Sequence, residues 1–308
     1  MSDTGLRYLF EAFNAGSMRA ASDRLNVAAS SISRQIAQLE DTYGLALIEK
    51  GRRGIRLTHA GEIVIAHYRN QLADREALRA KLEELRAVRS GHVVLAVGEG
   101  FLGASFTQMI EGFSRSNPHI RLELLIGSSQ DIVRMVMDDD AHIGLVFQAP
   151  HDMKLSVRQV IAQPLMAIVS PDHPLAGEAS VTIRQLAGHP LCLAPHHFRL
   201  RQILGEAEAR NATFLEPSIT TGSIHVMREM AKSGAALTIL PQVSLWKELE
   251  EGHLVSVAIA DDEMEDTTIS LVLRAGRQLE GAPGRLCKII EAQLRQWSRP
   301  PRPAQPLP

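Results

Sequence analysis

The stretch that decides the fold is residues 17–61, SMRAASDRLNVAASSISRQIAQLEDTYGLALIEKGRRGIRLTHAG. Its first part predicts a short helix that ends at Leu25, and its middle predicts a second helix from about residue 28 to residue 43. Asn26 and Val27 form the tight turn between them, because Asn tolerates left-handed backbone geometry and Val can pack between two helices.

The second predicted helix has two unlike faces. Ile32, Ile36 and Leu39 fall at i, i+4 and i+7, which is the spacing of a buried helical face. The opposite face carries short side chains and one cation, at Ala29, Ser30, Ser33, Arg34 and Gln38. Short polar side chains with one Arg suit a helix that lies in the major groove of DNA. Gly44 ends this helix.

A basic hairpin follows the helical pair. Leu45–Glu49 and Ile55–Leu57 predict two short strands around a turn that carries Lys50, Arg52 and Arg53. A helical pair alone is more often an ordinary αα-hairpin, and a cationic turn alone is usually just solvated. In this order the two features indicate a winged helix-turn-helix, whose second helix contacts base edges and whose wing contacts phosphates.

The segment resembles the LysR-type transcriptional regulators. The residues that carry the resemblance are Gly16, Ser17, Ala20, Ala21, Leu25, Val27, Ser33, Arg34, Gln35, Ile36, Leu39, Glu40, Gly44, Leu47, Arg52, Arg53, Leu57, Thr58, Ala60 and Gly61. Most members carry a Gln-Pro pair where this chain has Ala29–Ser30, and Gln bonds adenine bidentately whereas Ala does not. The resemblance therefore implies the mode of docking on double-stranded DNA and leaves the preferred bases open.

A long helix follows the head. Thr58 can cap a helix from residue 59 to about residue 89. Its apolar seam is predicted at Ile65, Tyr68, Leu72, Leu78, Leu82 and Leu85. Such a helix either packs on its own domain or forms a dimer seam, and its place between a small head and a larger body favours the seam. We expect a homodimer, and the resemblance also implies a homotetramer as an alternative. A dimer has two recognition helices, so its DNA site is expected to be an interrupted inverted repeat. RNA polymerase is a further expected partner.

Length and charge fit a small basic head on an acidic body. The 308 residues predict two or three domains, and a hydrophobic content of 45% is ample for their cores. Residues 1–90 hold 14 Lys and Arg against 11 Asp and Glu, whereas the remainder holds 19 against 24. This asymmetry is typical of a DNA-binding module joined to a body that does not bind DNA.

Other features exclude membrane and metal classes. No apolar run approaches the ~20 residues of a membrane helix, and residues 1–10 lack the pattern of a signal peptide. We therefore expect a cytoplasmic protein with no membrane partner. Cys192 and Cys287 fit no metal spacing, and Cys192 is expected to be a small buried residue rather than half of a redox pair. We expect no metal and no cofactor.

From His92 the pattern changes to strands that alternate with helices, which predicts a parallel sheet with right-handed crossovers. The order of one α/β unit, a second unit and a return to the first resembles the periplasmic-binding-protein-like body of the same family. The fold class is thus α/β with an all-α-rich head. The predicted parts are a winged helix-turn-helix (1–58), a linker or dimerisation helix (59–89), an effector-binding domain (90–297) with subdomain 1 at about 90–162 and 267–297 and subdomain 2 at about 163–266, and a disordered Pro-rich tail (298–308).

A ligand of this α/β body is expected beyond the carboxyl ends of its strands. The candidate contacts lie in loops that reach this edge, at Glu99, Gly100, Phe101, Ser128, Ser129, Phe147, His197, Arg199, Arg201 and Thr221. Amides that open helices, serine hydroxyls and an Arg favour a small-molecule effector with a carboxylate. Each contact also has a structural alternative: Ser128 can be only a helix cap, the two Arg can be solvated, and Glu99 either selects a cationic group or faces solvent.

We therefore predict a sequence-specific DNA-binding transcription regulator, controlled by a small molecule bound between two α/β subdomains. An α/β enzyme and a cytosolic solute-binding protein with an incidental helical head are the alternatives. The sequence contains no nucleophile elbow, phosphate-binding loop or metal motif, so no catalytic residue is assigned. The cationic wing and the long helix disfavour a plain solute-binding protein.

Overall fold

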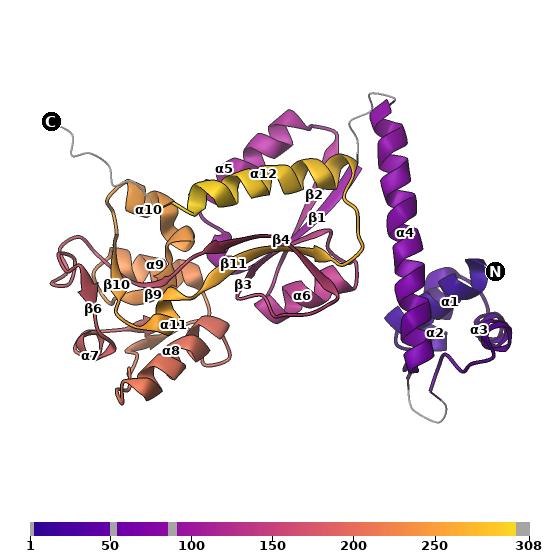
Figure 1. Cartoon of the computed structure of the whole chain (residues 1–308), viewed down its shortest axis with the longest axis horizontal. Helices are drawn as coiled ribbons and strands as arrows, with labels where there is room; N and C mark the ends of the chain where they lie inside the picture. Colours follow the sequence, from indigo (N-terminus) through magenta and orange to yellow (C-terminus); the bar gives the residue numbers. More distant parts are fainter. Residues whose placement is uncertain (1–2, 50–53, 86–90, 300–308) are drawn as a thin grey trace. The chain divides into compact units, whose positions relative to one another are not determined.

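The computed structural model describes residues 3–49, 54–85 and 91–299, and Figure 1 shows their helices and strands. Residues 1–79 and residues 80–308 form two compact units. The first unit is helical, and the second holds the sheets.

The first unit is built around one apolar core. Its helices are α1 (Asp3–Asn14), α2 (Met18–Leu25), α3 (Ala29–Tyr43) and the first part of α4 (His59–Leu85). The core holds Leu6, Leu9, Ala12, Ala21, Ile32, Ile36, Leu39, Leu47, Ile65 and Tyr68. Burial of positions 32, 36 and 39 confirms the predicted apolar face of α3. Helix α1 is an addition to the predicted elements.

Local capping fixes the ends of these helices. Ser17 caps α2, since its Oγ accepts a hydrogen bond from the Ala20 amide at 3.1 Å. Asn26 has φ 53° and ψ 47°, so the predicted left-handed turn is confirmed. Gly44, with φ 65°, ends α3. Thr58 Oγ1 accepts from the Gly61 amide at 3.1 Å and starts α4 as predicted.

The hairpin after α3 is shorter than the sequence predicts. The described residues retain a bridge between Ile48 and Leu57 in place of two strands. The Glu40 carboxylate accepts hydrogen bonds from the amides of Leu47 and Ile48 at 2.7 and 3.2 Å. A side chain of α3 thus bonds backbone amides that a neighbouring strand would bond in a longer hairpin. The wing cations Lys50, Arg52 and Arg53 lie outside the described residues.

The apolar side chains of α4 divide into two groups, which corrects the single predicted seam. Ile65 and Tyr68 are buried in the core of the first unit. Leu72, Leu78 and Leu82 are exposed, the last two by 58% and 52%. Ile65 and Tyr68 are therefore core residues of the head. The side chain of Leu85 and residues 86–89 lie outside the described part.

The first sheet of the second unit has the strand order β2-β1-β3-β11-β4. Its strands are β1 (Gly91–Val97), β2 (Ile120–Ile126), β3 (Ile143–Phe147), β4 (Leu155–Ala162) and β11 (Thr268–Arg274). Figure 1 shows α5 (Ala104–Ser116) and α12 (Gly281–Trp297) over one face and α6 (Ser129–Met137) over the other, with an apolar core beneath each layer. We call this sheet and its helices subdomain 1.

The second sheet has the strand order β6-β10-β5-β9, and it forms subdomain 2. Its strands are β5 (Leu165–Val169), β6 (Ser180–Val181), β9 (Thr238–Pro241) and β10 (Val255–Ile259), beside a parallel pair of β7 (Cys192–Leu193) and β8 (Ile219–Thr220). One core contains side chains of α7 (Ile183–Leu186), α8 (Arg199–Arg210) and α11 (Asp262–Glu265). Another contains side chains of α9 (Ile224–Lys232), the 3₁₀ segment η2 (Gln242–Leu245) and α10 (Trp246–Glu250).

Both sheets are mixed, which corrects the predicted parallel arrangement. Strands β1, β2 and β3 are parallel, but β11 is antiparallel to β3 and β4, and β5 is antiparallel to β9 and β10. β5 and β11 are the strands that begin where the chain crosses between the subdomains. Each of these two strands therefore runs in the direction opposite to both of its neighbours in the sheet.

The chain passes between the subdomains twice, once between β4 and β5 at Gln163 and once between α11 and β11 at Thr267. A buried hydrogen-bond cluster joins these two crossings. The Gln163 amide donates to the Thr267 carbonyl at 2.8 Å, and Thr267 Oγ1 donates to the Gln163 carbonyl at 2.6 Å. The Gln163 side chain donates to the Trp297 carbonyl of α12 at 2.7 Å and accepts from the Val243 amide of η2 at 3.1 Å. We call these four residues the crossing clasp, because they link both chain crossings to both subdomains.

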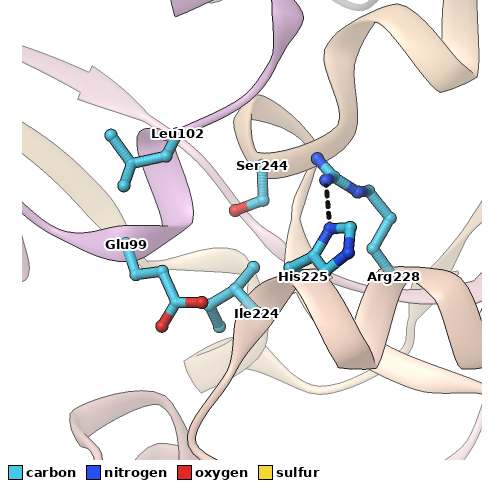
Figure 2. Close-up of a pocket in the computed structure, with 6 residues that line it drawn as sticks. All are labelled: Glu99, Leu102, Ile224, His225, Arg228 and Ser244. Atoms are coloured by element: carbon cyan, nitrogen blue, oxygen red, sulfur yellow. Dashed lines mark hydrogen bonds between the residues drawn. The ribbon is translucent and has the colours of Figure 1, made fainter.

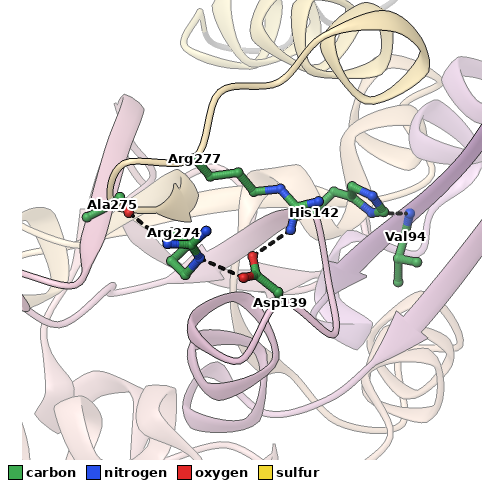
Figure 3. Close-up of polar contacts among 6 residues, drawn as sticks. All are labelled: Val94, Asp139, His142, Arg274, Ala275 and Arg277. Atoms are coloured by element: carbon green, nitrogen blue, oxygen red, sulfur yellow. Dashed lines mark hydrogen bonds and ion pairs between the residues drawn. The ribbon is translucent and has the colours of Figure 1, made fainter. Parts of the chain in front are cut away.

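A second polar cluster closes the far end of subdomain 1 (Figure 3). Asp139, in the turn after α6, has φ 62° and accepts hydrogen bonds from Arg274 Nε and Arg277 Nη1. Arg274 also donates to the Ala275 carbonyl at 3.2 Å. One carboxylate thus ties the end of β11 and the following loop to the turn that leads into β3. Figure 3 also shows His142, whose Nδ1 accepts from the Val94 amide at 3.0 Å.

Candidate functional sites: a helix face and a cleft between subdomains

The exposed face of α3 is the candidate DNA-binding surface. Ser30, Ser33, Arg34 and Gln38 are exposed and Ala29 is half-buried, while the opposite face of the helix is in the core. Gln38 Oε1 accepts a hydrogen bond from the side chain of Gln35 at 2.9 Å. Ala28 precedes the helix and provides no side-chain cap, so the first amides of α3 keep their capacity to bind an anion.

In the second unit, one hydrogen bond crosses from one subdomain to the other near the predicted ligand loops. Glu99 lies in the 3₁₀ segment η1 (Glu99–Phe101), directly after β1. Ser223 precedes α9 and caps it through the Val226 amide at 3.4 Å. Ser223 Oγ also donates to Glu99 Oε1 at 3.0 Å. This bond joins the loop after β1 to the start of α9.

A pocket of about 230 Å³ lies beside this bond. Its walls are Glu99 and Leu102 from subdomain 1 and Ile224, His225, Arg228 and Ser244 from subdomain 2. Figure 2 shows Glu99 on one side, Arg228 and His225 on the other, and the Ser244 hydroxyl directed into the space between them. Apart from Glu99, none of these side chains is among the ligand contacts predicted from the sequence. His225 and Arg228 share an i, i+3 face near the start of α9, a signal that could have been read, whereas nothing local marks Ser244.

The predicted serine donors are engaged by protein groups. Ser128 caps α6: its Oγ accepts from the Asp131 amide at 3.2 Å and donates to Asp131 Oδ2 at 2.7 Å. The Ser128 side chain and the nearby Arg134 lower the pKa of Asp131. Ser129 Oγ donates to the Phe147 carbonyl at 2.9 Å. Both hydroxyl protons are thus used within the protein in this structure, and contact of Ser128 and Ser129 with a ligand stays a prediction.

Two other candidate contacts, Phe101 and Arg201, have buried side chains. Phe101 packs in the core of subdomain 1. Arg201 is 2% exposed and bonds Glu208 through both terminal nitrogens at 2.8 and 3.3 Å, and Glu208 also accepts from the Leu215 amide at 2.8 Å. Both side chains are held in the fold by these contacts, and their contact with a ligand stays a prediction.

The remaining candidates lie near solvent. Arg199 is exposed and pairs with Glu206 at 3.4 Å, and His197 is exposed with its ring centroid 4.9 Å from that of Phe198. Thr221 Oγ1 accepts from the Ser223 amide at 3.1 Å, which shapes the turn that presents Ser223 to Glu99. Gly100 approaches subdomain 2 closely, since an added Cβ would lie 3.2 Å from Ser244 Oγ.

Two family models match the chain. Residues 4–62 match the bacterial regulatory helix-turn-helix protein, lysR family, and residues 86–295 match the LysR substrate binding domain. The chain belongs to the LysR family. It is a DNA-binding transcription regulator with an effector-binding domain, as predicted, and residues 4–62 of this LysR-type regulator hold the helix face described above.

Individual relatives are distant but extend over most of this LysR-type regulator. It is 25% identical to the HTH-type transcriptional regulator BbuR of Bordetella bronchiseptica, over 87% of this chain and 82% of that protein. It is 26% identical to the SDS degradation transcriptional activation protein of a Pseudomonas species, over 90% and 91%. A full-length OxyR variant from Pseudomonas aeruginosa has the same fold, with a TM-score of 0.66, 19% identity and 99% coverage of both chains.

The cysteines of this LysR-type regulator lie in the interior. Both are buried, and burial raises the pKa of the Cys192 thiol. Burial and the nearby Glu291 raise the pKa of Cys287 to about 11. Neither thiol is present to a large extent as the reactive thiolate near neutral pH. Among the described residues, no helix could span a membrane.

The buried Arg201–Glu208 pair gives a stability prediction. Arg201→Ala leaves a buried carboxylate without its cation and should lower the free energy of unfolding by about 3–5 kcal/mol. Arg199→Ala, the control, removes an exposed pair and should cost less than about 1 kcal/mol. Urea unfolding followed by tryptophan fluorescence reports on the second unit alone, because both tryptophans of the chain, Trp246 and Trp297, lie there. Equal midpoints for the two variants would contradict the structural role of Arg201.

Proposed function

We propose that α3 lies in the major groove of DNA, with Ala29, Ser30, Ser33 and Arg34 nearest the base edges and Gln38 beside them. The observation that carries this proposal is the exposed face of α3, whose side chains are mostly short and polar. The opposite face of the same helix is packed in the core. Arg34 is the long cation on that face and can bond guanine bidentately. The wing cations Lys50, Arg52 and Arg53 contact phosphates in this proposal, as does the uncapped start of α3.

We further propose that the exposed leucines of α4 form a dimer seam. Leu78 and Leu82 are one helical turn apart, and both are more than half exposed. An apolar strip of this kind on a helix is typical of a surface that a second helix covers. Two copies bring two recognition helices to the DNA, so the operator is an interrupted inverted repeat with half-sites about 34 Å apart. The assembly is a homodimer or homotetramer that acts in the cytoplasm with RNA polymerase as a further partner.

The effector in this proposal is a small polar metabolite bound between the two α/β subdomains. Support comes from the two crossings at the clasp, which permit a hinge motion, and from the Glu99–Ser223 bond on the cleft side. A ligand that contacts both subdomains shifts the equilibrium by its differential affinity for the two closure states. The protein acts by binding, without catalysis and without a cofactor.

Arg34 provides the direct test of the DNA-binding face. Arg34→Ala should weaken binding to an operator selected in vitro from random DNA by about 1–3 kcal/mol and relax the preference at one position of each half-site. Arg115→Ala, an exposed arginine on α5, is the matched control and should leave both unchanged. The measurement is a gel shift followed by repeated selection with each variant. The same affinity and the same selected motif for Arg34→Ala and wild type would refute this docking mode.

The dimer seam is tested by charge. Leu78→Asp combined with Leu82→Asp would bury carboxylates in the seam and should convert the oligomer to monomers, because an unpaired buried charge is costly. Leu45→Asp, at an equally exposed leucine of the head, should keep the wild-type assembly. Light scattering coupled to size exclusion gives the mass of each variant. An intact oligomer of the double variant would exclude this surface as the seam.

A further inference from the structure

Two residues that line the pocket between η1 and α9 carry a buried polar atom without a hydrogen-bond partner. These atoms are Ser244 Oγ and Arg228 Nε, and the latter lies 3.9 Å from Glu229 Oε1. Ser244 is only 2% exposed, and its hydroxyl points into the pocket (Figure 2). Buried polar groups in folded proteins are almost always hydrogen-bonded. The buried Ser244 hydroxyl, which has no partner and faces this cavity, therefore points to a polar ligand.

Charged side chains of opposite sign lie on the two sides of the pocket. Glu99 provides a carboxylate on the subdomain 1 side, where Ser223 satisfies one of its oxygens. On the subdomain 2 side, Arg228 Nη1 lies 3.4 Å from a Glu248 oxygen, and its Nη2 lies 2.9 Å from His225 Nδ1. An arginine only donates hydrogen bonds, so His225 Nδ1 accepts, and the neutral ring carries its proton on Nε2. Cationic and N–H donors therefore lie opposite the Glu99 carboxylate.

We propose that this pocket binds a small zwitterion of the amino-acid type, with its ammonium group on Glu99 and its carboxylate toward Arg228 and His225. The Ser244 hydroxyl lies between the two ends and can bond either group. The volume of about 230 Å³ suits a ligand smaller than a typical drug-sized molecule. Because Glu99 belongs to one subdomain and Arg228 to the other, the ligand bridges both. The inference rests on the proposed effector control, for which it names the chemical class of effector.

The carboxylate of Glu99 explains why a simple anion is disfavoured. A dicarboxylate would place one negative group near Glu99 and another near Arg228, whose charge Glu248 already offsets in part. A free amine would leave Arg228 Nε, which lies 3.9 Å from Glu229 Oε1, without a hydrogen-bond acceptor. A ligand that carries both groups pairs with both sides of the pocket, and a buried donor or acceptor left unpaired is costly.

Isothermal titration calorimetry on the full-length protein tests the proposal. The probes are the standard L-amino acids, one at a time, and for each that binds, its N-acetyl and its amide derivatives, which lack the cation and the anion respectively. We expect a subset of the free amino acids to bind, and each derivative to bind about tenfold to a hundredfold more weakly. Absence of binding by every amino acid, or equal binding of the N-acetyl derivative, would overturn the proposal.

Two variants connect the binding to this pocket. Glu99→Gln keeps an acceptor for Ser223 but removes the charge, and Ser244→Ala removes the buried hydroxyl. Each substitution should therefore lower the affinity for the amino acid about tenfold or more. Glu111→Gln, at an exposed residue of α5, is the matched control. Thermal melting shows whether each variant is folded. Unchanged affinity in folded Glu99→Gln and Ser244→Ala would place the ligand elsewhere and overturn the proposal.

A gel shift with the selected operator separates this inference from the proposed effector control. Amino-acid binding that depends on Glu99 and leaves operator binding unchanged would uphold the zwitterion pocket and refute control by it. An operator response to a metabolite whose binding is indifferent to Glu99 and Ser244 would uphold effector control and refute this pocket as the effector site.

Discussion

The effector-binding domain depends on the crossing clasp, where two short chain segments join its two sheets. Gln163 and Thr267 exchange backbone and hydroxyl hydrogen bonds, and the Gln163 side chain reaches α12 on one side and η2 on the other. All of these groups are buried, so each lost partner would leave an unsatisfied polar atom at a cost of about 1–3 kcal/mol. The clasp therefore fixes the position of the hinge, and the strands that start there must run antiparallel to their neighbours.

The availability of polar groups decides which part of the cleft can hold a ligand. Ser128 and Ser129 look like ligand donors in the sequence, yet their protons go to Asp131 and to the Phe147 carbonyl. By contrast, Ser244 has no hydrogen-bond partner among the described residues although it is buried. A buried polar atom without a hydrogen-bond partner is therefore a better indicator of the ligand pocket than a serine at the start of a helix.

The sequence predicts the features that depend on neighbouring residues. The turn at Asn26, the apolar face of α3 and the cap at Thr58 follow from local geometry and periodicity, and the structure has them where predicted. Strand direction at the crossings, the split surface of α4 and the burial of Arg201 depend on distant partners. Arg201 on a helix reads as solvated until Glu208 and the segment around Leu215 enclose it.

The same division applies to the site. Glu99 could be predicted because it directly follows a strand end, whereas Ser244 and Arg228 approach it only through the folding of subdomain 2. The family resemblance located the DNA-binding module through the residues of the helical pair, and the matched regions agree with it.

The central claim is that the two subdomains hinge at the clasp and are held together across the cleft at Glu99. A distance measurement by electron spin resonance tests it, with labels on cysteines introduced by Glu111→Cys in subdomain 1 and Glu216→Cys in subdomain 2. The native Cys192 and Cys287 are buried and resist labelling. The account predicts that Glu99→Ala, which removes the bond to Ser223, gives a broader and longer distance distribution than the parent. Identical distributions would contradict it.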